Sequence, residues 1–114
     1  GKAAKQVLEN LQRWDDYKDR LIQGINIGQT FQQTRSQAVN LGIVSNSQLV
    51  LNNFKGVLIP SHLHQPIKQQ LVILKHSKKI AQAERFVTLL MSKQAQQFIT
   101  ESGYALSNEM NANE

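Results

Sequence analysis

A turn from a short, mainly apolar segment into a helix is the first place where this sequence could bind a ligand. Residues 21–24 end in Gly24, and Asn26 then occupies the position expected for a helix N-cap before Ile27. The first turn of a helix offers unpaired backbone N–H groups and about half a positive charge, which together suit an anion. Such turns occur in every α/β protein, so spacing alone also fits plain scaffold.

A hydroxyl group follows the next predicted strand. Residues 41–44 are apolar, and the strand that they predict delivers Ser45 to the sheet edge where Ile27 lies. Open α/β sheets bind their ligands at the carboxyl ends of their strands. The start of the helix at Ile27 and the hydroxyl of Ser45 are therefore the candidate ligand contacts.

Side-chain arrangements typical of enzymes and metal sites are weak in this sequence. Three aspartates lie beside Lys18 and Arg20, which is typical of a solvated helix end; they are Asp15, Asp16 and Asp19. His62 and His64 form a His-x-His pair in a loop flanked by proline, without a neighbouring carboxylate or thiol. The sequence has no nucleophile elbow, phosphate-binding glycine loop, zinc-protease motif or cysteine. We expect no enzyme, no cofactor and no metal ligands from side chains.

The composition indicates one globular domain. The chain has 114 residues, of which 40% are hydrophobic and 18% charged, and its formal net charge is +5. That excess could attract nucleic acid, an anionic membrane surface or a small anion. The densest basic cluster, residues 75–79, lies between two apolar segments, which favours a short solvated connection. The longest apolar runs, such as residues 71–74, are far shorter than the ~20 residues of a membrane span.

Helices and short strands must position these residues. Apolar side chains at helical spacing predict four helices, at residues 2–14, 27–39, 80–91 and 95–99. Asn40 lies at the expected C-terminal cap of the second helix, and Gly103 at the C′ position of the fourth. Short apolar runs predict four strands, at residues 21–24, 41–44, 56–60 and 67–74. The alternation of strand and helix in the first half predicts an α/β fold with a parallel sheet.

The two ends of the sequence carry their own expectations. The chain opens on Gly-Lys-Ala-Ala-Lys without an initiator Met and enters an amphipathic helix at once, so we expect residues upstream. A helix ahead of the first strand also indicates that the sheet has lost a member. Residues 107–114 are polar, and we expect a flexible tail there.

Four stretches of the sequence carry a family resemblance. They are Gly1-Lys2-Ala3-Ala4-Lys5-Gln6-Val7-Leu8 with Leu11, Trp14 and Asp15, then Leu41-Gly42-Ile43-Val44, residues 66–74, and Ser92-Lys93-Gln94-Ala95-Gln96 through Ser102-Gly103-Tyr104. In this order, over residues 1–106, they resemble the periplasmic molybdate-binding proteins of ABC transporters. Each stretch is weakly diagnostic alone, and the ordered set is fairly specific.

The resemblance implies a type II periplasmic-binding-protein fold, in which an oxyanion lies in a cleft between two lobes. It implies that backbone N–H groups at helix starts and hydroxyls, all neutral, hold molybdate or tungstate. By the family pattern the backbone N–H of Ile27 is one donor and the hydroxyl of Ser45 another. Some relatives have Tyr at the second position, and the shorter Ser45 departs from that version.

The resemblance covers only the C-terminal portion of that fold. It implies that residues 1–66 are part of the second lobe and that residues 67–106 return, as a crossover strand and helices, to the first lobe. It places two Ser donors and a further backbone donor outside this chain, so we expect the chain alone to bind molybdate poorly. The incomplete sheet leaves unpaired edges, which favour a homodimer of the fragment.

The implied role is the solute-binding component of an ABC importer, with the membrane permease as partner. The implied location is the periplasm, or the outer face of the membrane through a lipid anchor in a Gram-positive organism. The main alternative is the effector-sensing domain of a transcription regulator with the same two-lobe fold. A nucleic-acid-binding module is suggested only by the net charge of +5, and we expect no nucleic-acid partner. Molybdate and tungstate are too similar in size for the sequence to separate them.

Overall fold

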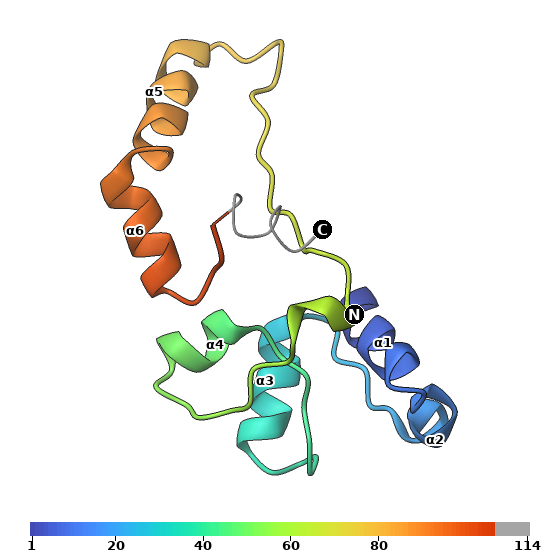
Figure 1. Cartoon of the computed structure of the whole chain (residues 1–114). Coiled ribbons are helices and arrows are strands. Elements are labelled where there is room, and N and C mark those ends of the chain that lie inside the picture. The colour runs from blue at the N-terminus through green and yellow to red at the C-terminus, as the bar shows by residue number, and fades with distance from the viewer. Residues whose placement is uncertain (107–114) are drawn as a thin grey trace.

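Helices are the regular elements of residues 1–106, the part of the chain that this computed structural model describes (Figure 1). In chain order they are α1 (Lys2–Asn10), α2 (Trp14–Tyr17), the 3-10 helix η1 (Lys18–Arg20), α3 (Ile27–Arg35), α4 (Asn46–Leu51), the 3-10 helix η2 (Ser61–Leu63), α5 (Ile80–Leu90) and α6 (Lys93–Glu101). No helix within those residues is both long enough and apolar enough to cross a membrane. The tail predicted at residues 107–114 lies outside the described residues.

Local sequence signals mark two of the helix ends. α3 begins at Ile27 as predicted, because Oδ1 of Asn26 accepts the N–H of Gln29 at 2.8 Å and so caps the first turn. Gly103 takes the predicted C′ position after α6 with a φ of 97°, and its N–H donates to the carbonyl of Thr100 at 3.0 Å. Both predictions are confirmed.

Other helix boundaries differ from the prediction. α3 stops at Arg35, short of its predicted end, because Gln37 adopts a left-handed φ of 61° that a helix cannot continue. Asn40 is therefore not its C-terminal cap. α1 likewise stops at Asn10, ahead of Gln12, whose φ is 57°. α4 is missing from the prediction because its 6 residues make less than two turns, too few for apolar periodicity to show.

The four predicted strands are not formed within residues 1–106. The segments at residues 21–24, 41–44, 56–60 and 67–74 have neither helix nor strand structure, and no ladder of backbone hydrogen bonds joins them. A strand forms only when a neighbouring segment satisfies its backbone hydrogen bonds, and these four segments do not do this for one another. The predicted parallel sheet is thus absent from the described residues. Apolar side chains of these segments stay in solvent, as at Val57 (93% exposed) and Val72 (80% exposed).

A small core lies around α3. Phe31 is 2% exposed, and its ring meets that of Phe54 edge to face, with the ring centroids 5.7 Å apart. Val7 of α1 and Ser47 of α4 are also buried. Within residues 1–106, only Val7, Phe31 and Ser47 are buried.

Two glycines let non-helical segments approach α3 closely. A Cβ on Gly24 would overlap the hydroxyl of Thr30. A Cβ on Gly42 would overlap the side chain of Thr34, one turn further along the same helix. The segments before and after α3 therefore lie against the same face of it.

The helices α5 and α6 pack against each other and form an arm (residues 80–101) that stands apart from α1–α4 (Figure 1). Residues 67–79 lead out to the arm, and none of residues 67–106 is buried. The radius of gyration is 17.1 Å. A packed domain of this length has about 13 Å, and the difference reflects this open arrangement.

Candidate functional site

The start of α3 presents two unpaired backbone donors. The N–H of Gln29 donates to Oδ1 of Asn26 at 2.8 Å, and the N–H of Thr30 donates to the Asn26 carbonyl at 3.2 Å. The N–H groups of Ile27 and Gly28 have no acceptor among residues 1–106. Because the first N–H groups of a helix cannot bond within that helix, these two are available to a ligand.

The segment before α3 is held against its first turn, and the space beside Gly28 is largely open. The N–H of Ile25 donates to Oε1 of Gln29 at 2.7 Å, which ties the approach to α3 to its first turn. A Cβ added to Gly28 would have one neighbour within 4 Å, Oδ1 of Asn26 at 3.3 Å. An oxygen atom can therefore come close to the backbone of Gly28.

Ser45 is the N-cap residue of α4 and lies in extended backbone, with φ of −76° and ψ of 145°. Its Oγ lies 3.0 Å from Oγ of Ser47, so the two hydroxyls are hydrogen bonded. The side chain of Ser45 makes no capping bond to the α4 backbone. Ser47 is 5% exposed and thus holds the Ser45 hydroxyl from a buried position.

The segment that leads to Ser45 returns along α3. The chain passes Thr34 at Gly42 and then runs back along the helix toward α4 (Figure 1). Ser45 ends this returning segment and begins α4.

Sequence reasoning missed the contact that covers the start of α4. The Nδ2 of Asn46 donates to the carbonyl of Gly103 at 3.3 Å, and a Cβ on Gly103 would lie 2.9 Å from Cα of Ser47. The chain after α6 therefore lies directly on α4 and helps to bury Ser47. The sequence marked Gly103 as a helix end, but no local pattern signals a partner so far away. The Ser45-x-Ser47 spacing was the available sign of the hydroxyl pair.

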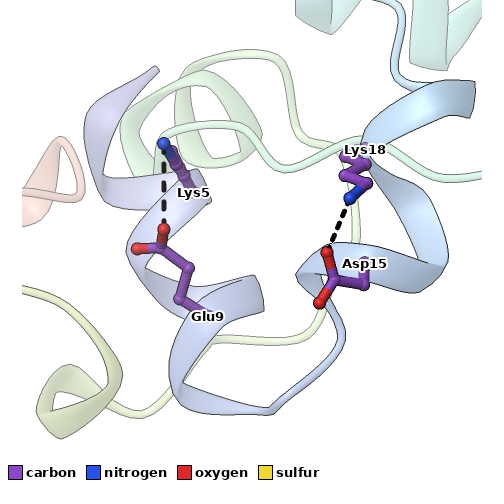
Figure 2. A network of polar contacts seen from close by, with 4 residues as sticks. All are labelled: Lys5, Glu9, Asp15 and Lys18. Atoms are coloured by element: carbon purple, nitrogen blue, oxygen red, sulfur yellow. Dashed lines mark hydrogen bonds and ion pairs between the residues drawn. The ribbon is translucent and has the colours of Figure 1, made fainter.

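Glu9 and Asp15, near the N-terminus, are each paired with a nearby lysine. The Nζ of Lys5 lies 3.8 Å from Oε1 of Glu9, and the Nζ of Lys18 lies 2.8 Å from Oδ1 of Asp15 (Figure 2). Both pairs are formed within α1–η1, between residues three or four apart, and are partly exposed. They reduce the negative charge at this end of the chain.

The cluster of aspartates is a solvated helix end, as predicted. The side chain of Asp15 is 86% exposed, and Asp16 binds Arg13 at 2.9 Å while 53% exposed. The hydrogen bond from Arg13 to Asp16, together with the negative charge of Asp16, raises the pKa of the Arg13 guanidinium. Two of the three aspartates of this cluster are thus paired with cations.

His62 and His64 lie at a polar recess beside α1. The recess is lined by Gln6, Glu9, Asn10, His62, His64 and Gln65. The Nδ2 of Asn10 donates to the Leu63 carbonyl at 2.8 Å, and Nδ1 of His64 donates to the Gln65 carbonyl at 2.8 Å. Within residues 1–106, no group of three or more His, Cys, Asp or Glu residues could hold a metal ion.

Comparison with known proteins relates most of the chain to one family. A family model described as bacterial extracellular solute-binding protein matches residues 1–105. The molybdate-binding protein ModA of Azotobacter vinelandii is 34% identical over 110 residues, which cover 93% of this chain and 44% of that protein. The molybdate-binding protein ModA of Rhodobacter capsulatus is 28% identical over 105 residues, or 91% of this chain and 42% of that protein.

A more distant relative is named without a specific solute. It is a putative ABC transporter substrate-binding lipoprotein, YvgL, of Bacillus subtilis, and it is 24% identical over 106 residues. The match covers 91% of this chain and 41% of that protein. The chain thus spans less than half the length of these curated relatives. No solved structure matches it.

Proposed function

We propose that this chain, which belongs to the bacterial extracellular solute-binding protein family, forms one wall of a cleft for a tetrahedral oxyanion such as molybdate or tungstate. The observation that carries the proposal is the start of α3, where the N–H groups of Ile27 and Gly28 have no acceptor among residues 1–106. Two relatives are molybdate-binding proteins by name, which supports an oxyanion as the solute. The proposed role is transport, not catalysis.

Neutral donors suit an anion of this shape. A helix start carries about half a positive charge, and each hydrogen bond to a charged acceptor contributes about 1.5–3 kcal/mol. In the proposed cleft, Ser45 adds a hydroxyl. When Ser47 donates the hydrogen bond between the two serines, the hydroxyl proton of Ser45 is left for the ligand. In this arrangement Ile27 contributes its backbone and Ser45 its side chain.

A complete cleft needs a second wall. Exposed apolar side chains on the predicted strand segments, such as Val57 and Val72, support a sheet that further chain completes. The complete protein would have the α/β type II periplasmic-binding-protein fold, with residues 1–66 in the second lobe and residues 67–106 returning to the first. It would work outside the cytoplasm and pass its solute to the membrane permease of an ABC importer. None of the three relatives is named as a transcription regulator, so that alternative has no support.

The substitution Ile27→Pro tests the backbone donor. Proline is favoured at the first helical position and removes the N–H, and Asn26 before it is already extended, with φ of −155° and ψ of 172°. In a complete receptor we expect the affinity for molybdate, measured by titration calorimetry, to fall about tenfold to a hundredfold. Ile27→Ala keeps the N–H and is the matched control, with nearly unchanged affinity.

Two results would contradict the proposal. Equal losses of affinity in Ile27→Pro and Ile27→Ala would show that the side chain matters and the N–H does not. No heat from the complete receptor with molybdate, tungstate or sulfate would exclude an oxyanion as the solute. The 114-residue chain alone is expected to bind none of them tightly, because the proposal places the remaining donors on the second wall.

A further inference from the structure

The connection into α5 is the most basic segment of the chain. We call this segment, residues 75–79, the basic turn; it consists of Lys75, His76, Ser77, Lys78 and Lys79. The N–H of Ser77 donates to the Leu74 carbonyl at 3.0 Å, and the N–H of Lys79 donates to the Ser77 hydroxyl at 3.1 Å. All its side chains except that of Ser77 are exposed. The turn leads into the end of α5 that is remote from α1–α4 (Figure 1).

Among residues 1–106, no acidic side chain pairs with the basic turn. The sequence contains no Asp or Glu between Asp19 and Glu84. Within residues 1–106, none of the three lysines of the turn joins an ion pair. Lys18, in contrast, binds Asp15 at 2.8 Å (Figure 2). The basic turn therefore concentrates three lysines that form no ion pair with residues 1–106, in a segment that local hydrogen bonds hold in shape.

Exposed aliphatic side chains flank the basic turn. Leu74, directly before the turn, is 72% exposed, and Ile80, directly after it, is 38% exposed. No Phe, Tyr or Trp occurs between Phe54 and Phe86, so the segment lacks the stacking surfaces that single-stranded nucleic acid favours. Cations beside exposed aliphatic side chains are typical of segments that lie at the surface of an anionic bilayer.

We propose that the basic turn and Leu74 dock on an anionic phospholipid surface. The ammonium groups bind lipid phosphates, while the lysine stems and Leu74 enter the boundary with the acyl chains. Each lysine near such a surface strengthens binding roughly fivefold, so three lysines together contribute on the order of a hundredfold. That is too little to anchor a protein alone. The contact orients a chain that another attachment holds near the membrane, and it does not depend on the oxyanion proposal.

Vesicle flotation at low salt tests the proposal on the chain itself. The probes are vesicles of phosphatidylcholine and vesicles of phosphatidylcholine mixed with phosphatidylglycerol. The test variant is Lys75→Gln/Lys78→Gln/Lys79→Gln, in which all the changed side chains are exposed, so far-UV circular dichroism should not change. We expect the variant to bind the phosphatidylglycerol vesicles about a hundredfold more weakly than the wild type. Added salt should weaken the wild type far more than the variant.

The matched control variant also replaces three lysines by glutamine, so it lowers the net charge as much as the test variant does, but near the N-terminus. It is Lys2→Gln/Lys5→Gln/Lys18→Gln, and we expect it to lose only a few-fold in vesicle binding because it leaves the docking segment intact. Leu74→Ser should also weaken binding by a few-fold, and this loss should persist at high salt. Equal weakening by the two triple variants would overturn the proposal. So would a wild type that binds both kinds of vesicle equally.

Discussion

The region around α3 and α4 (residues 21–58) and the arm follow the same local rules but differ in packing. Each has a capped helix: Asn26 caps α3, and Oγ of Ser92 accepts the N–H of Ala95 at 3.2 Å at the start of α6. The α3–α4 region buries Phe31 and Ser47, whereas no residue of the arm is buried. Caps therefore decide where helices begin, and burial depends on partners from elsewhere in the chain.

Contacts within the arm are mostly local. The Nε2 of Gln96 donates to the Leu90 carbonyl at 2.8 Å across the turn between α5 and α6. Phe86 and Phe98, on the apolar faces of these helices, are 58% and 69% exposed. A helix whose apolar face stays in water gains little from tertiary packing. The same substitution should therefore lower the free energy of unfolding more in the α3–α4 region than in the arm.

The largest difference is expected from removing an aromatic ring. Phe31→Ala deletes a side chain that is 2% exposed and should lower the free energy of unfolding by about 3–5 kcal/mol. Phe86→Ala, the matched change in the arm, removes a side chain that is 58% exposed and should cost less than about 1 kcal/mol. Urea unfolding followed by circular dichroism measures both. Similar losses would show that the arm is packed as tightly as α3.

A smaller effect is expected where the two regions meet. Gly103→Ala forces a side chain into a φ of 97° and places its Cβ 2.9 Å from Cα of Ser47, so it should destabilise the chain by about 1–3 kcal/mol. Hydrogen exchange should show lost protection in both α4 and α6. Gly28→Ala is the control, since its Cβ would have one neighbour within 4 Å, a side-chain oxygen at 3.3 Å. Loss of protection confined to α6 would mean that the arm is independent.

The smallest effect should be equal in the two regions. Asn26→Ala and Ser92→Ala each remove a side chain that accepts a backbone N–H at the start of a helix, at 2.8 Å and 3.2 Å. Each should cost about 1 kcal/mol of unfolding free energy, and Asn26→Ser and Ser92→Thr should recover most of it. Thermal unfolding compares the four variants. A clearly larger loss at Asn26 would show that the cap of α3 also supports the core.

The sequence predicted the features that depend on neighbours along the chain. The start of α3 follows from Asn26, and the end of α6 follows from the conformational freedom of Gly103. The predicted strands depend on distant partners, so an apolar run alone could not show whether residues 21–24 or 67–74 pair. α4 was missed because its 6 residues are too few for apolar periodicity to show, although Ser45 before it is of a type that favours the N-cap position.

The candidate site also has a part that depends on local sequence and a part that depends on distant residues. Its backbone part, the free N–H of Ile27, follows directly from where α3 begins, and sequence could locate it. Its side-chain part depends on the pairing of Ser45 with Ser47 and on the chain after α6 that covers them. The Ser45–Ser47 bond is local, but the contact between Asn46 and Gly103 joins residues that are 57 positions apart, which is why the covering of Ser47 was not predicted. Ligand contact at Ile27 and Ser45 stays a prediction.

The contact between Asn46 and Gly103 has a mechanical consequence. These two residues are 57 positions apart, and their hydrogen bond closes the intervening chain into a ring that includes η2 and the whole arm. The entropy lost on closing such a ring grows only with the logarithm of its length, so a longer arm would add little to that cost. The arm is thus connected to the α3–α4 region at both of its ends, through residues 67–79 and through Gly103. A force applied to α6 reaches the residue next to Ser45 without passing through the rest of the ring.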